Sequence, residues 1–157
     1  MRLPNSILNL LTVDTNAYAP GDVVGGKLTF DLSAFRDVDQ LMLSSLVLSD
    51  KSDQASTYYL ILFATDPSNT TFTDNGALNI HDSDVQKIFA ILPIAVELDV
   101  GGARVRTLDP TYTAAIPIPL AGTDTSNKIY GCLALLTGTP TFAAADLALR
   151  MNFSFTR

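Results

Sequence analysis

Apolar and polar residues alternate along much of this chain with a period of two residues. The last segment shows the pattern clearly, because Leu149 and Met151 fall on one face while Arg150 and Asn152 fall on the other. Successive side chains of a β-strand point to opposite faces of a sheet. The pattern therefore predicts a half-buried strand over residues 147–156.

Similar alternation, or a short continuous apolar run, predicts further strands elsewhere. These strands are expected at residues 26–32, 41–48, 57–64, 94–99, 103–108, 113–120 and 128–137. Residues 57–64 and 128–137 are apolar on both faces, so both faces of these two strands should be covered. Pro117 and Pro119 lack amide donors, which places their segment at a sheet edge.

Turn signals separate these runs at intervals typical of a β-sandwich or barrel. Residues 19–22 (Ala-Pro-Gly-Asp) fit a type II turn. Residues 100–103 (Val-Gly-Gly-Ala) fit a tight hairpin turn. From this spacing we predict an all-β fold, namely an antiparallel, jelly-roll-like β-sandwich that occupies residues 17–157 as a single domain.

One segment carries a helix signal. Ser83 and Gln86 form a capping-box pattern, and apolar residues follow at helical spacing. We therefore expect one short helix over residues 84–91, which Pro93 would end.

The first sixteen residues allow two interpretations. Five large apolar side chains precede the first clear turn: Ile7, Leu8, Leu10, Leu11 and Val13. They form either a first core strand or an arm that packs on a neighbouring molecule. We predict that residues 1–16 serve attachment to a partner more than folding, with these five side chains as the partner-binding residues.

Composition restricts the classes of partner. The chain has 157 residues and a net charge of −6, and its basic residues form no cluster. Binding to nucleic acid or to an anionic membrane is therefore not expected. The N-terminus lacks the uninterrupted apolar core of a signal peptide, which predicts that the protein is made and kept in a cytoplasm.

Groups that could support catalysis are few. His81 is the only histidine, Cys132 the only cysteine and Glu97 the only glutamate. No nucleotide-loop, metalloprotease or serine-hydrolase motif occurs, so we expect no enzyme activity, no cofactor and no metal. His81 should lie at the surface or cap a helix, and Cys132 should be a buried, unreactive thiol. Residues 66–76 form either an ordinary polar loop or a weak calcium site.

Four segments, in this order along the chain, resemble the capsid decoration (cement) proteins of tailed bacteriophages. They are residues 18–26, 46–52, 60–63, and 72–76 leading into 82–91. The similarity covers residues 17–92, whereas the C-terminal half resembles the family only in being rich in β-structure.

The resemblance implies a virion protein on the outside of an icosahedral capsid, made in the bacterial host. Such a protein would bind the major capsid protein and clamp neighbouring subunits, often as a homodimer. Two alternatives are a carbohydrate-binding or host-recognition module of a phage tail, and a small hydrolase with a pair of aspartates.

Overall fold

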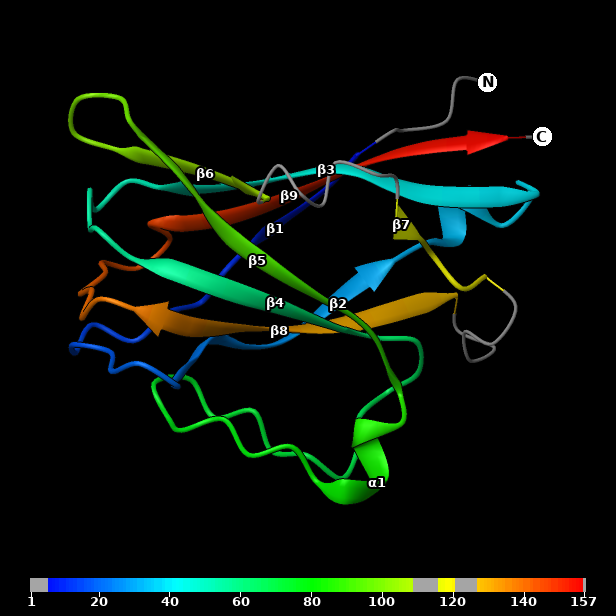
Figure 1. The fold of residues 1–157 in the computed structure, drawn as a ribbon, viewed down its shortest axis with the longest axis horizontal. Helices are drawn as coiled ribbons and strands as arrows, with labels where there is room; N and C mark the ends of the chain where they lie inside the picture. The colour runs from blue at the N-terminus through cyan, green and yellow to red at the C-terminus, as the bar shows by residue number, and fades with distance from the viewer. Residues whose placement is uncertain (1–5, 109–115, 121–126, 157) are drawn as a thin grey trace.

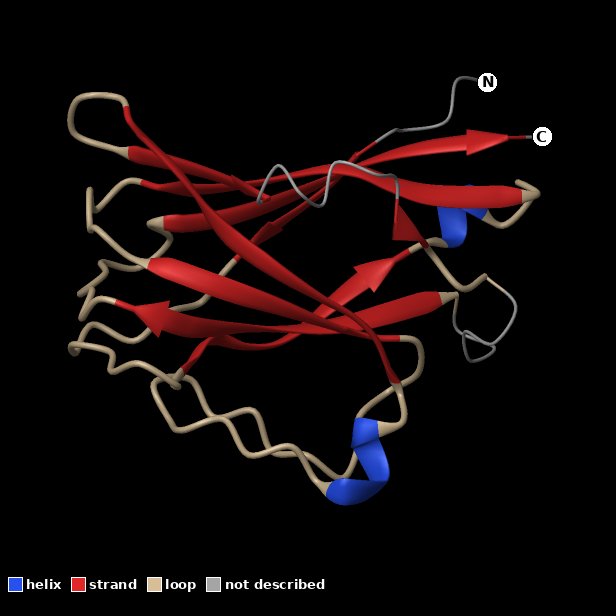
Figure 2. Cartoon of the chain, in the orientation of Figure 1, coloured by secondary structure: helices blue, strands red, loops and turns tan. Residues whose placement is uncertain are grey.

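The computed structural model describes residues 6–108, 116–120 and 127–156. Antiparallel β-strands dominate this part of the chain (Figures 1 and 2). The strands are β1 (Ser6–Leu10), β2 (Val23–Asp31), β3 (Gln40–Asp50), β4 (Thr57–Phe63), β5 (Ile88–Asp99), β6 (Arg104–Leu108), β7 (Ile116–Pro117), β8 (Lys128–Thr137) and β9 (Leu147–Thr156). In the described ranges, no helix is long and apolar enough to span a membrane.

The strands form one sheet in the order β1-β9-β3-β6-β5-β4-β8-β2, and β7 pairs with β3 beside this path. The two end strands, β1 and β2, lie close to each other. The Asn9 side-chain amide of β1 donates a hydrogen bond to the Thr29 carbonyl of β2 at 3.1 Å. The sheet is therefore nearly closed and barrel-like. The prediction of an antiparallel all-β fold is confirmed at this level.

The main hydrophobic core fills the inside of the curved sheet. Alternate residues of the long strands point into it, among them Leu60 and Leu62 of β4 and Leu149 and Met151 of β9. A second, smaller cluster lies on the outer face. There, residues 64–81 fold over Ile61 and its buried neighbours on β4, β8 and β2. Both faces of β4 are thus covered at this end, whereas Tyr59 of β4 and Leu136 of β8 are exposed, so the prediction that both faces are covered holds for only part of these two strands.

Connections between strands cover the seam between β1 and β2 at both ends. At one end the short 3-10 helix η1 (Ser33–Phe35) buries Phe35, whose ring lies 5.3 Å from that of Phe153. At the other end the Tyr18 amide donates to the Pro140 carbonyl at 3.0 Å, and the Tyr18 ring packs edge-on against Phe142. These contacts hold the curved sheet together at the seam, where β1 and β2 are not paired through their backbones.

The predicted turns are present. Gly21 has a φ of +96°, and the Asp22 amide donates to the Ala19 carbonyl at 3.0 Å, as a type II turn requires. Gly101 and Gly102 both have positive φ and join β5 to β6. Glycine is well suited to these positions because a side chain would be strained there.

The prediction of one short helix is confirmed, but its range of residues 84–91 is wrong. Helix α1 spans only Asp82–Val85, and its N-cap is His81 rather than Ser83. The chain then enters β5 at Ile88 and continues through Pro93, which lies opposite Tyr59 of β4. Backbone pairing of residues 88–92 with β4 stabilises the extended form more than a helix of two turns could be stabilised.

The N-terminal segment forms a first strand that also belongs to the core. Strand β1 pairs with β9 along its whole length. Leu11 and Val13, two of the five residues predicted to bind a partner, are buried in the main core. Ile7 is partly buried against the same core, whereas Leu8 and Leu10 are exposed on the outside.

Two adjacent leucines provide a matched test of this placement. Leu11 is 2% exposed and packs over the backbone of Gly25, whereas Leu10 is 68% exposed. Leu11→Ala should lower the free energy of unfolding by about 2–5 kcal/mol because it leaves a cavity. Leu10→Ala should change it by less than about 0.5 kcal/mol. Urea denaturation measures both values, and equal effects would contradict the assignment of Leu11 to the core.

Candidate functional site

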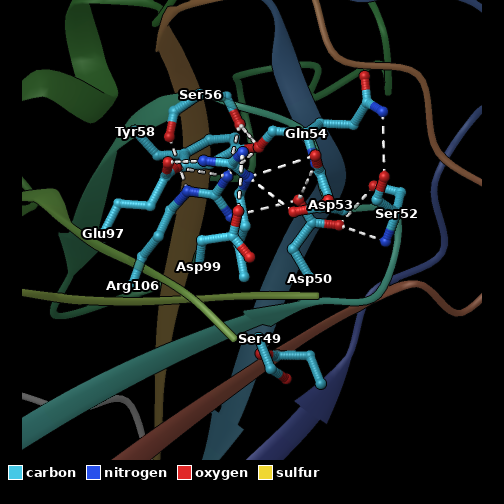
Figure 3. Close-up of polar contacts among 12 residues, drawn as sticks. Ser49, Asp50, Ser52, Asp53, Gln54, Ser56, Tyr58, Glu97, Asp99 and Arg106 are labelled. Atoms are coloured by element: carbon cyan, nitrogen blue, oxygen red, sulfur yellow. Dashed lines mark hydrogen bonds and ion pairs between the residues drawn. The ribbon is translucent and has the colours of Figure 1, made fainter. Parts of the chain in front are cut away.

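A cluster of charged side chains lies where the chain connects β3 to β4. The sheet order places β6 and β5 between these two strands, so residues 51–56 must cross over both of them. Side chains from β6 and β5 meet this connection from below (Figure 3). We call this group the arginine cluster; its members are Asp50, Asp53, Gln54, Ser56, Tyr58, Glu97, Asp99, Arg104 and Arg106.

Arg106 of β6 is the centre of the arginine cluster and is fully buried. Its Nε donates to the Ser56 carbonyl at 2.7 Å, and its Nη2 donates to the Gln54 carbonyl and to the Ser56 hydroxyl. Its Nη1 lies 3.3 Å from the carboxylate of Asp50, which is also buried. The guanidinium stacks over the Tyr58 ring, 5.4 Å from the ring centroid. It therefore fixes residues 54–58 through charge and hydrogen bonds together.

Glu97 of β5 bridges the two arginines. Its Oε2 lies 2.8 Å from Arg106 Nη2, and its Oε1 pairs with Arg104 Nη1. Arg104 Nε then reaches Asp53 Oδ1 at 2.9 Å in the crossing connection. The hydrogen bond to Glu97 raises the pKa of Arg104, which keeps this guanidinium charged.

The cluster fits an anchor better than a reaction centre. Asp50 and Glu97 are the carboxylates that a hydrolase could use as a pair, and both are bound to Arg106. Throughout the described residues, every buried side-chain nitrogen and oxygen has a hydrogen-bond partner. Both carboxylates are therefore engaged by the same guanidinium, which suits a structural contact between strands and connection.

A second anchor holds the long connection between β4 and β5. Asp84 of α1 is buried and accepts hydrogen bonds from the Asn69 amide at 3.0 Å and the Thr70 hydroxyl at 2.7 Å. Its other oxygen pairs with Lys87 at 2.7 Å. Desolvation raises the pKa of Asp84, but the bonds from Lys87 and Thr70 together outweigh it and lower the pKa to about 2.

A third anchor joins three segments at Asp74. Its carboxylate accepts from the Tyr18 hydroxyl at 2.9 Å, from the Gly25 amide at 2.6 Å and from the Asp14 amide at 2.6 Å. Desolvation, followed by the bond to Asp74, raises the pKa of Tyr18. Asp66 pairs with Lys27 at 2.8 Å. The acids of loop 66–76 thus bind protein groups, and among the described residues no three His, Cys, Asp or Glu side chains converge as a metal site would.

His81 and Cys132 both have structural roles. The His81 ring accepts from the Ser83 amide at the start of α1, so the prediction of a capping histidine is confirmed. Cys132 is buried in the outer cluster, and this burial raises the pKa of its thiol to about 12. A thiol with this pKa is almost entirely protonated at neutral pH and is a poor nucleophile.

Five residues are predicted to bind a partner, and two of them are clearly exposed in the structure. Leu8 and Leu10 are 48% and 68% exposed on β1. The arginine cluster was not predicted. The only local signal is the pair of arginines at alternate positions of β6, and the partner Asp50 lies 56 residues away in the chain.

Comparison of the chain with protein-family models and with curated protein sequences finds no match.

Removal of Arg106 should destabilise the fold strongly. Arg106→Met keeps much of the volume but leaves Asp50 buried without its cation, which costs about 3–5 kcal/mol of unfolding free energy. Arg150→Met is the control, because Arg150 is exposed on the outer face of β9, and it should cost less than about 0.5 kcal/mol. Thermal or urea unfolding compares the two. A loss below about 1 kcal/mol for Arg106→Met would contradict the anchor.

Asp84 should make stability depend on pH in the acid range. Its pKa is lowered from 3.8 to about 2, so its contribution is present above pH 4 and is lost as the pH falls towards 2. The stability difference between wild type and Asp84→Asn should therefore shrink over that range. Urea unfolding at several pH values measures it. The variant Asp82→Asn, at an exposed position of the same helix, is the control and should keep the acid dependence that Asp84 confers.

Proposed function

We propose that this protein is a structural virion protein that binds the outside of an icosahedral phage capsid and clamps neighbouring capsid subunits. The sequence resemblance over residues 17–92 supports this role. In this proposal the protein acts by binding and has no catalytic activity. Its partner is the major capsid protein, and its place is the capsid exterior after synthesis in the bacterial host.

One structural observation carries the proposal. The charged groups that could take part in a reaction lie around Arg106, Asp84 and Asp74, and they bind the connections between strands of this chain. By contrast, large apolar side chains remain on the outside of the sheet. Such a surface is suited to contact with another protein rather than to chemistry on a small substrate.

Leu8 and Leu10 are the residues that we assign to the capsid contact. They lie on the outer side of β1, opposite Arg150 and Ala148 of β9. Burial of each against a neighbour would contribute roughly 1.5–3 kcal/mol. Many copies on one particle make even this modest contact effective through avidity.

The strand order supports the finer architecture in this proposal, a jelly-roll-like sandwich. With β7 set aside, the first strand pairs with the last (β1 with β9), the second with the next to last (β2 with β8), and so on inward (β3 with β6, β4 with β5). A long antiparallel hairpin rolled on itself has this pairing, which is typical of a jelly roll. In this view β1, β9, β3 and β6 face β2, β8, β4 and β5 across the core.

The alternatives gain less support. A glycan-binding module would present several aromatic platforms, and Tyr59 is the one aromatic side chain that is clearly exposed in the described ranges. A hydrolase would need a carboxylate pair free to exchange protons, and the closest candidates bind Arg106.

The capsid role can be tested by adding the protein back to particles. Virions of the phage that encodes the chain would be prepared without it and mixed with purified protein. Wild type should sediment with the particles and appear as density on the outer surface in electron cryomicroscopy. The double variant Leu8→Ser, Leu10→Ser should lose most of this binding, because two apolar contacts are removed while the core is untouched.

Val100→Ser is the matched control. Val100 is 53% exposed at the turn between β5 and β6, at a distance from β1 along the sheet order. This variant should bind particles as wild type does. Absence of wild-type protein from the particles would refute the capsid role. Full binding by the double variant would refute only the assignment of Leu8 and Leu10.

A further inference from the structure

The outer face of β5, β4 and β8 is apolar and only partly covered. Residues 64–81 cover one end of it, over Ile61 and Phe63. Beyond this cover lie five exposed apolar side chains: Tyr59, Ile91, Val96, Leu98 and Leu136, each between 36% and 64% exposed. We call these five residues and the strand surface between them the bare face.

The positions of these residues on one side follow from the buried ones. Leu92 and Ile94 point into the core and Glu97 points to buried Arg106, so Ile91, Val96 and Leu98 point outward. Ile94 points inward and Val96 outward although they are two residues apart, and the register shift between them accounts for this change. The bare face thus follows β5 along most of its length.

The bare face has a ridge and a groove. Val96 and Leu98 protrude near the β5–β6 turn, and Leu98 is 64% exposed. At the other end a shallow apolar groove of about 480 Å³ lies between Tyr59, Ile91 and Leu136. Leu98 and Ile91 are seven residues apart on β5, which is roughly 23 Å along a strand.

The charged side chains of β5 and β6 pair with one another in the arginine cluster. They are Glu97, Asp99, Arg104 and Arg106. The chain as a whole carries a net charge of −6, so most of its surface repels a second copy. An uncharged face is where two identical anionic chains can meet without burying like charges, and interface cores are depleted in charge in this way.

The size of the face also suits a second copy. Its three strands, with a spacing of about 4.8 Å and over about seven residues, present roughly 330 Å² of flat sheet. A specific interface requires about 500 Å² from each partner, and the side chains add to the flat estimate. A single sheet face of this size packs well against another sheet face.

We propose that two copies of this chain associate through the bare face about a two-fold axis. In such an arrangement the ridge at Leu98 of one copy fills the groove at Ile91 of the other, and the reverse contact follows by symmetry. The axis crosses β5 near Ala95, an exposed small residue midway between ridge and groove that allows close approach. The inference does not rest on the capsid role, because association is measured on the free protein.

Sedimentation velocity tests the association directly. Wild type should sediment as a dimer at micromolar concentrations, whereas Ile91→Lys and Leu98→Lys should each sediment as a monomer over the same range. Leu10→Lys, which places the same charge on the exposed outside of β1, should remain dimeric. Circular dichroism confirms that each variant is folded. A wild-type protein that stays monomeric at high micromolar concentration would overturn the proposal.

Cross-linking tests the two-fold geometry without disrupting the face. Native Cys132 is buried, so an introduced cysteine provides the one accessible thiol of the described residues. Oxidised Ala95→Cys should form a covalent dimer with itself. A short bis-maleimide should join an equimolar mixture of Leu98→Cys and Ile91→Cys far more than either variant alone. Leu10→Cys should give only the background level. A wild-type dimer in which Ala95→Cys and the mixture fail to cross-link would show that another surface associates.

Discussion

The buried guanidinium of Arg106 resolves a problem that the winding of the chain creates. Because β6 and β5 lie between β3 and β4, the connection between β3 and β4 must cross two strands at one end of the core. A crossing segment exposes backbone carbonyls over an apolar interior, and unpaired carbonyls there would be costly. Arg106 donates to the carbonyls of Gln54 and Ser56, and Asp50 balances its charge. The end of the barrel-like sheet is closed by polar contacts where apolar packing alone could not satisfy the backbone.

The same solution recurs at the other connections, each with one ionised group at its centre. Asp84 holds residues 69 and 70 against α1, and Asp74 joins the Asp14 and Gly25 amides to the Tyr18 hydroxyl. Strand β4 carries no charged residue, and the two acids of β5, Glu97 and Asp99, pair with the arginines of β6. The arginine cluster thus takes up the charges of these strands, and the remaining exposed side chains of β4 and β5 are apolar.

Local patterns explain why most strands were predictable and the first half of β5 was not. Along β9 the alternation is regular, and the strand faces core on one side and solvent on the other, so period and burial agree. In β5 the residues around Ile88 and Leu92 satisfy both a helical and an alternating pattern, and a register shift at Phe63 breaks the alternation. Only pairing with β4, distant in the chain, decides between them. The arginine cluster was beyond prediction for a related reason, since Arg106 and Asp50 become neighbours only through the order of the strands.

The strand order also sets the two candidate binding surfaces apart. Leu8 and Leu10 lie on the outer side of β1 beside β9, whose outward positions, such as Arg150 and Asn152, are polar. The bare face lies on β5, β4 and β8, and β3 and β6 separate β5 from β9 in the order of the sheet. Two copies that met through their bare faces would therefore keep both β1 edges free. A pair of identical edges held at a fixed separation can engage two neighbouring subunits at once, and the second contact then forms at a high effective concentration. Clamping would in this way follow from the position of the two surfaces on the sheet, and neither contact alone would need to be strong.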